Sequence, residues 1–177
     1  MADVTKLAVR AGRGDGAALA DFVKSTIADL RRYCAAMVDD QSADDLVQQT
    51  YIKAIRALSS YRGEASAKAW LLGVARHTCI DEIRQRQRRR AVEQPGLIVD
   101  PPVTNSPFEQ FALQDLIANL VPERREAFVL TQLVGFSYDE AAATIGCPVG
   151  TVRSRVYRAR ADLSAMLNSQ AAATAPR

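Results

Sequence analysis

The stretch SYDEAAATIGCPVGTVRSRVYRARADL, residues Ser137–Leu163, predicts two helices separated by a short turn. Ser137 and Glu140 form a capping box, in which each side chain satisfies a backbone N–H at the start of a helix. Gly146 suits the left-handed residue that ends a helix, and Pro148 suits the first turn of the next one. Two helices joined by a turn of three or four residues that contains glycine indicate a helix-turn-helix.

The second of these helices, near residues 148–167, combines one apolar stripe with a basic outer face. At about 100° per residue, the stripe that packs on the domain consists of Val152, Val156, Ala159 and Leu163. The opposite face presents a set that can contact guanine or phosphate, namely Arg153, Ser154, Tyr157 and Arg158. Arg155 and Arg160 lie nearer the edges of the stripe, where they support the helix or hold phosphates. A solvated helix usually mixes both charges, so this pattern favours contact with DNA.

Residues 91–107 interrupt the helical pattern, because four prolines and Gly96 prevent a continuous helix. We expect a flexible linker here, between an N-terminal domain of residues 10–90 and a C-terminal domain of residues 108–168. Residues 169–177 are expected to be a disordered tail. The predicted helices of the C-terminal domain lie near residues 108–120, 122–134, 137–145 and 148–167. The fold class is therefore all-α, with two small helical domains.

The N-terminal domain is predicted to contain three main helices. The first spans Gly16–Val38, the second follows Ser42 as its N-cap and ends near Leu58, and the third begins near Ser66. Apolar residues recur along the second helix at three- and four-residue spacing, which predicts a buried face of Ala43, Leu46, Val47, Thr50, Tyr51, Ala54, Ile55 and Leu58. Its other face carries Asp45, Gln48, Gln49, Ile52 and Arg56.

The loop between the second and third helices places Tyr61, Arg62 and Gly63 directly before a basic helix. An aromatic ring on which a base stacks, beside arginines that follow the phosphates, suits single-stranded nucleic acid. The alternative is an ordinary hairpin loop whose Tyr61 packs into the core. The loop sequence alone leaves both interpretations open.

Charge is distributed unevenly along the 177 residues, although the net charge is only +3. Residues 61–90 carry a net charge of +5 and residues 150–177 a net charge of +4, while the stretch between them is acidic. Two separate contacts with a polyanion explain this pattern better than solvated helix faces do.

Several other classes of protein fit the sequence poorly. No apolar run is long enough to cross a membrane, and no signal peptide precedes the first helix, so a cytoplasmic location is expected. The widely spaced Cys34, Cys79 and Cys147 are interpreted as small buried thiols, with a redox-sensing pair as the alternative. With His77 as the one histidine and no phosphate-binding loop, we expect no metal, no cofactor and no enzymatic activity.

Three blocks of the chain resemble the extracytoplasmic-function (ECF) sigma factors, bacterial transcription initiation factors that keep only regions 2 and 4. DLVQQTYIKAIRAL, residues 45–58, is similar to region 2.2. YRGEASAKAWLLGVARHTCIDEIR, residues 61–84, is similar to regions 2.3 and 2.4. SYDEAAATIGCPVGTVRSRVYRAR, residues 137–160, is similar to region 4.2. The order and spacing of the blocks cover nearly the whole chain.

The resemblance implies that the protein binds core RNA polymerase, carries it to a promoter and helps to open the DNA at the −10 element. Region 2 would dock on the clamp coiled coil of the β′ subunit, and region 4 on the β flap. The implied docking residues are Asp45, Gln48, Gln49, Ile52 and Arg56. Gln49 stands where the family usually has glutamate, which removes one charge from this face.

For promoter DNA, the resemblance places Tyr61 where relatives capture a flipped-out base. The implied −10 residues are Tyr61, Arg62, Gly63, Ser66, Arg76, His77 and Arg84. Trp70 is interpreted as core packing in preference to a melting wedge, and Arg86–Arg90 as phosphate contacts. The implied −35 residues are Gly150, Thr151, Arg153, Ser154, Tyr157 and Arg158, of which the first two suit a phosphate at a helix N-terminus.

An anti-sigma factor is a further partner that the family implies, and it could hold the protein at the membrane. The alternative function is a helix-turn-helix regulator that acts without polymerase, with an N-terminal half that senses a ligand or dimerises. Residues 43–84 discriminate the two, since they resemble a polymerase-binding and strand-opening block and not a sensor. A small enzyme is a third class, for which no acid–base cluster is present in the sequence.

Overall fold

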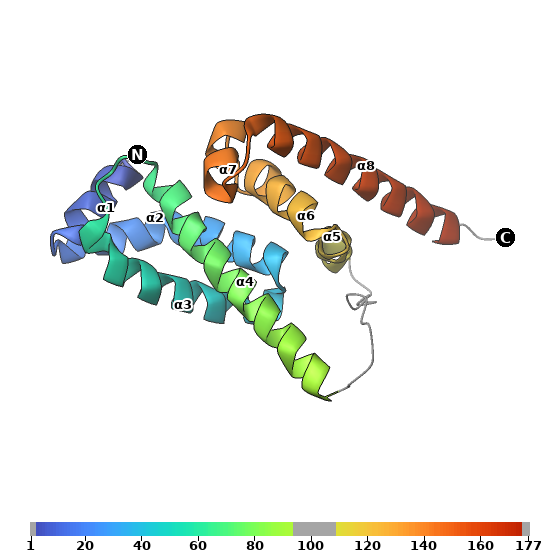
Figure 1. Cartoon of the computed structure of the whole chain (residues 1–177), viewed down its shortest axis with the longest axis horizontal. Helices are drawn as coiled ribbons and strands as arrows, with labels where there is room; N and C mark the ends of the chain where they lie inside the picture. The colour runs from blue at the N-terminus through green and yellow to red at the C-terminus, as the bar shows by residue number, and fades with distance from the viewer. Residues whose placement is uncertain (1–2, 94–108, 175–177) are drawn as a thin grey trace. The chain divides into compact units, whose positions relative to one another are not determined.

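The computed structural model describes residues 3–93 and 109–174, and every regular element in these two ranges is a helix. The chain divides into two compact units, Met1–Gly96 and Leu97–Arg177. The all-α prediction is therefore confirmed for the described residues (Figure 1). Of the linker expected at residues 91–107, residues 91–93 form the end of a helix, and the rest lies outside the described ranges.

The first unit contains α1 (Val4–Gly12), α2 (Gly16–Met37), α3 (Asp40–Ala57), a 3-10 turn η1 (Leu58–Ser60) and α4 (Ala67–Glu93). The observed α2 and α4 start close to where the sequence predicts. Helix α1 was not predicted, so the domain expected from residue 10 begins too late. Its apolar signal is short, and only Leu7 and Ala8 of this helix are buried.

The predicted start of α3 is wrong by three residues. Asp39 is the N-cap, and its carboxylate accepts a hydrogen bond of 2.7 Å from the Ser42 backbone N–H. The Ser42 hydroxyl instead accepts a hydrogen bond from Arg86 of α4. Asp39 and Ser42 are both good N-cap residues. The hydrogen bond from Arg86 of α4, which is remote in sequence, occupies the Ser42 hydroxyl and leaves Asp39 as the N-cap.

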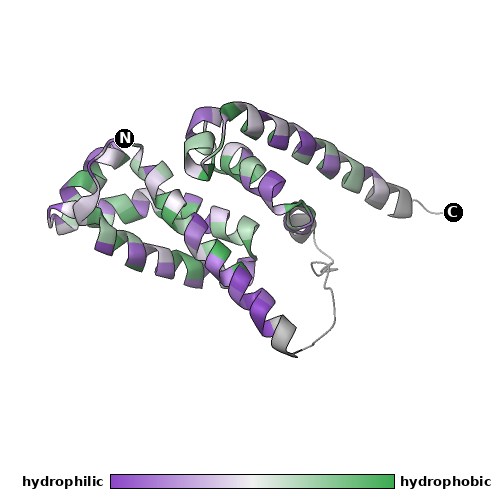
Figure 2. Cartoon of the chain, viewed as in Figure 1, coloured by the Kyte–Doolittle hydropathy of each residue, from purple (hydrophilic) through white to green (hydrophobic). Residues whose placement is uncertain are grey.

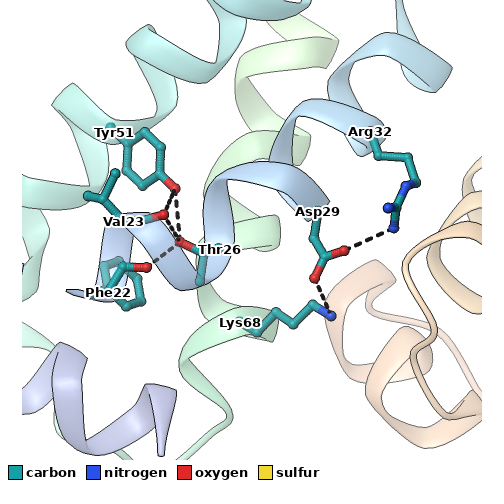
Figure 3. A network of polar contacts seen from close by, with 7 residues as sticks. All are labelled: Phe22, Val23, Thr26, Asp29, Arg32, Tyr51 and Lys68. Carbon is teal, nitrogen blue, oxygen red and sulfur yellow. Dashed lines mark hydrogen bonds and ion pairs between the residues drawn. The ribbon is translucent and has the colours of Figure 1, made fainter. Parts of the chain in front are cut away.

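The core of the first unit lies where α2, α3 and α4 pack together. Its largest fully buried side chains are Phe22, Leu30, Tyr33, Leu46, Leu71 and Leu72. Inside it, the hydroxyls of Thr26 and Tyr51 lie 2.8 Å apart and join α2 to α3 (Figure 3). The ammonium of Lys68 lies 2.7 Å from the Asp29 carboxylate and joins α4 to α2 (Figure 3). These polar contacts fix the register of the three helices, because a shift would leave buried hydroxyls unpaired.

The buried face of α3 agrees with the prediction except at Ile55, which is 44% exposed. In helical projection Ile55 lies about 100° from the centre of the buried stripe, so α2 and α4 do not cover it. Ile52 is 46% exposed on the side directly opposite the core. Two large apolar side chains are therefore exposed on one helix.

The interpretation of the cysteines as buried thiols is confirmed for Cys34 and Cys79, while Cys147 is partly exposed. The sulfurs of Cys34 on α2 and Cys79 on α4 lie 3.9 Å apart. Their spacing of 45 residues gave no indication of this proximity. Both thiols fill the interface between the two helices.

The second unit contains α5 (Glu109–Ala118), α6 (Pro122–Phe128), a π-helical turn η2 (Val129–Leu133), α7 (Tyr138–Ile145) and α8 (Val149–Thr174). The capping box of Ser137 and Glu140 is present at the start of α7. Gly146 ends α7 in the left-handed conformation, with φ at 78°. Pro148 precedes α8 by one residue, and its carbonyl accepts the hydrogen bond of the Thr151 N–H at 2.9 Å.

Helix α8 is longer than the sequence predicts. It continues to Thr174, so the disordered tail expected from residue 169 is wrong for residues 169–174. The segment contains three consecutive alanines, the residue with the highest helix propensity. Residues 175–177 lie outside the described ranges.

Hydropathy is unevenly distributed along α4 (Figure 2). Apolar residues occupy its first half, which packs in the core, and hydrophilic residues follow toward its C-terminal end.

Within residues 3–93 and 109–174, no helix has the length and apolar character needed to cross a membrane.

Candidate nucleic-acid and polymerase interfaces

The loop between η1 and α4 borders a cavity of about 260 Å³ that is open to solvent. It is lined by Ser60, Tyr61, Arg62, Glu64, Ala65 and Trp70. Two rings form its aromatic part, with the centroids of Tyr61 and Trp70 5.0 Å apart and their planes tilted by 38°. Tyr61 was predicted either to stack on a base or to pack into the core. Its ring is partly buried and also lines the cavity, so it combines features of both alternatives.

Trp70 corrects the sequence interpretation. It was expected in the core, but it is only partly buried and contributes a wall of the cavity. Its position four residues into α4 places it beside the loop that returns to this helix. The aromatic signal was visible in the sequence, but the side of α4 on which the ring would lie depends on how the loop folds.

The Tyr61 hydroxyl is held within the loop, where it donates a hydrogen bond to the Ala65 carbonyl. Burial raises the pKa of the Tyr61 phenol, and the nearby Asp3 carboxylate raises it further, although a hydrogen bond with Thr5 acts in the opposite direction. The phenol therefore stays neutral at physiological pH and presents an uncharged ring to the cavity.

The other residues expected at the −10 element lie around this cavity and along α4. Arg62, Ser66, His77 and Arg84 are exposed, whereas Gly63 and Arg76 are partly buried. Gly63 has φ at 80°, a conformation that favours glycine. The His77 Nδ1 lies 2.7 Å from the Gly73 carbonyl, to which it must donate, so Nε2 is the nitrogen available to a partner.

Arg86 does not fit the expected series of phosphate contacts. Its guanidinium donates to the carboxylates of Asp39 and Glu82 and to the Ser42 hydroxyl. Burial disfavours the charge of Asp39, yet hydrogen bonds from Arg86 and Ser42 outweigh this effect and hold the pKa of the carboxyl below its ordinary value. Arg86 thus ties α4 to the N-terminus of α3, while Arg84, Arg88 and Arg89 remain exposed.

The outer face of α3 presents every residue that was expected to dock on polymerase. Asp45, Gln48, Gln49, Ile52 and Arg56 are all exposed. Ile55, which the sequence pattern assigned to the core, is exposed within one turn of Ile52. This face combines polar side chains with an apolar pair, as the surface of a protein interface does.

The outer face of α8 presents its predicted reading residues to solvent. Tyr157 is 76% exposed, and Arg153, Ser154 and Arg158 are exposed beside it. Opposite them, Val152, Val156, Ala159 and Leu163 are buried, which confirms the predicted stripe. Gly150 and Thr151 lie in the first turn of α8. The Arg153 guanidinium lies 5.9 Å from the ring centroid of Tyr138 on α7.

The remaining arginines of α8, Arg155 and Arg160, contact neighbouring elements of the unit, which agrees with one of the two roles predicted for them, support of the helix or contact with phosphates. Arg155 is partly buried, and its guanidinium lies 3.8 Å from the Cys147 sulfur in the turn. Arg160 donates a hydrogen bond of 2.6 Å to the Gln132 side chain on η2. Arg155 and Arg160 therefore form polar contacts with neighbouring elements, whereas Arg153 and Arg158 lie on the outer face, with Arg153 near the ring of Tyr138.

These features define a class of protein, a helical DNA-binding protein with a helix-turn-helix unit and a second unit bearing an aromatic cavity. Family models match both units, sigma-70 region 2 over residues 22–89 and sigma-70 region 4 over residues 110–163. The chain is 45% identical over 166 residues to the ECF RNA polymerase sigma factor SigC of Mycobacterium tuberculosis, covering 92% of this chain and 90% of that protein.

Solved structures agree with these matches. The structure of CnrH in complex with the cytosolic domain of CnrY has a TM-score of 0.77 and 28% identity, over 95% of this chain and 99% of that one. The sigma factor RpoE of Bartonella quintana, in complex with the anti-sigma factor NepR, has a TM-score of 0.74 and 29% identity, over 85% of this chain and 96% of that one.

The chain belongs to the ECF sigma factors of bacterial RNA polymerase. It binds core polymerase and directs promoter-specific initiation of transcription. The alternative, a helix-turn-helix regulator that acts without polymerase, is not favoured, because the N-terminal half matches sigma region 2.

Proposed function

We propose that this sigma factor recognises its promoter through two sites of different kind, a cavity for the −10 element and a helix face for the −35 element. The observation that carries the proposal is the cavity lined by Tyr61 and Trp70, on the same unit as the basic helix α4. A volume of about 260 Å³ is below the usual range of about 300–1,000 Å³ for pockets that hold larger ligands. It suits a single base.

Capture of a base in this cavity requires more than one contact. Removing a base from the duplex stack costs a few kcal/mol, while stacking on one aromatic ring contributes about 1–3 kcal/mol. Two aromatic walls and the polar groups of Arg62 and Glu64 together offset the cost. The exposed Arg84, Arg88 and Arg89 of α4 then hold the adjacent backbone, because their guanidinium groups carry positive charge at the surface.

At the −35 element, α8 lies in the major groove with Arg153, Ser154, Tyr157 and Arg158 toward the bases. The buried stripe on the opposite side of α8 supports this orientation. An arginine that pairs with guanine O6 and N7 discriminates by about 1–3 kcal/mol against other bases. Gly150 and Thr151 bind a phosphate at the N-terminus of the helix.

Polymerase binds the exposed face of α3, which docks on the clamp coiled coil of the β′ subunit. Ile55 extends this face beyond the predicted set, since burying Ile52 and Ile55 together removes exposed apolar surface from water. The second unit docks on the β flap. Tethering both units to one polymerase raises the effective concentration of the second DNA contact once the first has formed.

The test is run-off transcription by holoenzyme assembled from core polymerase and the full chain, on a promoter library randomised at both elements. Replacing Tyr61 by alanine should flatten the base preference at one −10 position and leave the −35 preference unchanged. Replacing Asp45 and Gln48 together by alanine should weaken association with core polymerase while the fold is retained. A chain that binds the −35 sequence tightly and specifically without polymerase would contradict the proposal.

An anti-sigma factor is the partner that regulates this protein in the cytoplasm. Support comes from the related sigma factor RpoE, whose structure contains the anti-sigma factor NepR. Affinity purification of the chain from its bacterium, before and after depletion of core polymerase, checks this. Recovery of a partner that competes with core polymerase for the chain is the expected result.

A further inference from the structure

Helix α1 packs against the loop that forms the cavity. Residues 4–12 precede the segment matched by the region 2 model, which begins at residue 22, and no function was predicted for them. The helix lies beside η1 and the start of α4 (Figure 1). Three contacts, at Gly12, Val9 and Thr5, connect it to residues 58–67.

The first contact is between backbones. A Cβ atom on Gly12 would lie 2.3 Å from the Leu58 carbonyl oxygen and 3.0 Å from its carbonyl carbon. The C-terminal end of α1 therefore approaches η1 as closely as its backbone allows. Only glycine permits this approach, since the opposing atoms are backbone and cannot rotate away.

The second contact lies under the turn of the loop. A Cβ on Gly63 would be 3.2 Å from the Cγ2 atom of Val9 and 3.7 Å from that of Thr5. The left-handed conformation of Gly63 already limits this position to glycine. The loop thus rests directly on two side chains of α1.

The third contact is polar and reaches α4. The first N–H groups of a helix have no partner within the helix, and the Ala67 N–H donates to the Thr5 hydroxyl at 3.3 Å. Thr5 therefore contacts the residue that follows the loop, Ala67, and also lies beside Gly63 within the loop.

We propose that α1 is a positioning element for −10 recognition, in which Thr5, Val9 and Gly12 hold residues 58–67 in the shape that receives a base. The inference rests on the proposed function of the cavity. It assigns α1 no contact with DNA and no contact with polymerase. A loop held in one conformation before binding loses less conformational entropy when the base enters.

The test compares Thr5→Val with Thr5→Ser in transcription by holoenzyme on the randomised promoter library. Valine has nearly the same shape as threonine but no hydroxyl, while serine keeps the hydroxyl. We expect Thr5→Val to reduce discrimination at the Tyr61-dependent −10 position by about two- to tenfold, the usual range for one hydrogen bond. Permanganate reactivity of the opened promoter should fall in parallel. Thr5→Ser, which keeps the hydroxyl, should retain the −10 discrimination and the permanganate reactivity of the parent chain.

Lys6→Ala is the matched control, because Lys6 is an exposed residue of the same helix. It should behave as the parent chain does. In every variant, polymerase association and the −35 preference should equal those of the parent chain. Val9→Ala, which removes the methyl groups below Gly63, provides a second measurement should Thr5→Val unfold. It is expected to reduce the same −10 preference by a smaller factor.

Three outcomes distinguish the role of α1 from the function of the cavity on which it rests. If Tyr61→Ala leaves the −10 preference unchanged, the cavity is not the capture site and the proposed function fails. If Tyr61→Ala removes the preference while Thr5→Val and Val9→Ala retain it at the parent level, the role of α1 is overturned. A loss that is equal at all promoter positions and follows the melting temperature also overturns it, since it would show support of the fold alone.

Discussion

The two proposed DNA sites, the cavity of the first unit and the outer face of α8, have opposite geometry. The cavity is concave, and its aromatic walls are partly buried and supported by a helix that lies far away in sequence. The α8 face is convex, and its central Tyr157 is 76% exposed. A flipped-out base requires a preformed space, whereas the edges of paired bases are reached by side chains that extend from a rigid helix. Substitutions far from the cavity should therefore alter recognition of the −10 element, whereas on α8 a substitution should affect only the contact made by that residue.

The strongest test of this comparison uses one aromatic residue from each site. Trp70→Ala should lower the unfolding free energy of the first unit by about 2 kcal/mol, because truncation removes the apolar contacts of a large, partly buried ring, and should also impair promoter opening. Tyr157→Ala should change stability by less than about 0.5 kcal/mol and affect −35 binding alone. Circular dichroism melting and run-off transcription measure the two effects. If Trp70→Ala and Tyr157→Ala lowered the unfolding free energy equally, the proposed difference between the cavity and the α8 face would be wrong.

Arginine substitutions on α8 should have the next largest effect. Arg153→Ala or Arg158→Ala should cost about 1–3 kcal/mol and relax preference at one −35 position, if the guanidinium contacts a base. Arg160→Ala is the comparison variant, since Arg160 bonds Gln132 within the unit. Competition between promoter variants for holoenzyme measures the preference. A uniform loss on every promoter would assign the arginine to a phosphate.

The Arg86 contact predicts a pH-dependent effect on the first unit. The folded pKa of Asp39 is lowered, so its contribution to stability is present above the unfolded value of about 3.9 and is lost as the pH falls through the folded value. Asp39→Asn keeps a good helix cap and should cost about 1 kcal/mol near neutral pH. The fluorescence of Trp70, the one tryptophan of the chain, follows unfolding of this unit. A difference that persists unchanged below pH 3 would contradict the assignment.

The smallest expected effect concerns the ring of Tyr138 beside Arg153. A cation–π contact at an exposed site contributes about 0.5–1 kcal/mol. Tyr138→Leu should therefore weaken the −35 preference that depends on Arg153 by about two- to fivefold, and Tyr138→Phe should preserve it. The effect should disappear in the Arg153→Ala background, as a double-mutant cycle would show. Additive losses would mean that the two side chains act independently.

The helix-turn-helix was predictable because its signals are local. The capping box at Ser137, the left-handed Gly146 and the apolar stripe of α8 each depend on residues within a few turns. The same holds for the outer face of α3 around Ile52, which lies directly opposite the buried stripe. Ile55, at the edge of that stripe, could not be assigned by projection alone, because its exposure depends on how far α2 and α4 extend around it.

The cavity was only partly predictable. The sequence indicated Tyr61 and its loop, yet it placed Trp70 in the core and did not indicate α1. It also assigned Arg86 to DNA with its neighbours, whereas Arg86 binds Asp39, 47 residues earlier. In these cases the deciding partner is remote in sequence, and periodicity carries no information about it.

The sequence by itself determined the capping signals and apolar stripe of the helix-turn-helix and the family of this protein, because these follow from residues that are neighbours along the chain. The tertiary structure alone decided which aromatic rings line the cavity, that Arg86 supports the fold and what lies behind the loop. Its Thr5–Ala67 contact joins residues 62 positions apart. Such contacts form only when α1, α3 and α4 pack on one core, since their energies depend on distances that no local pattern specifies.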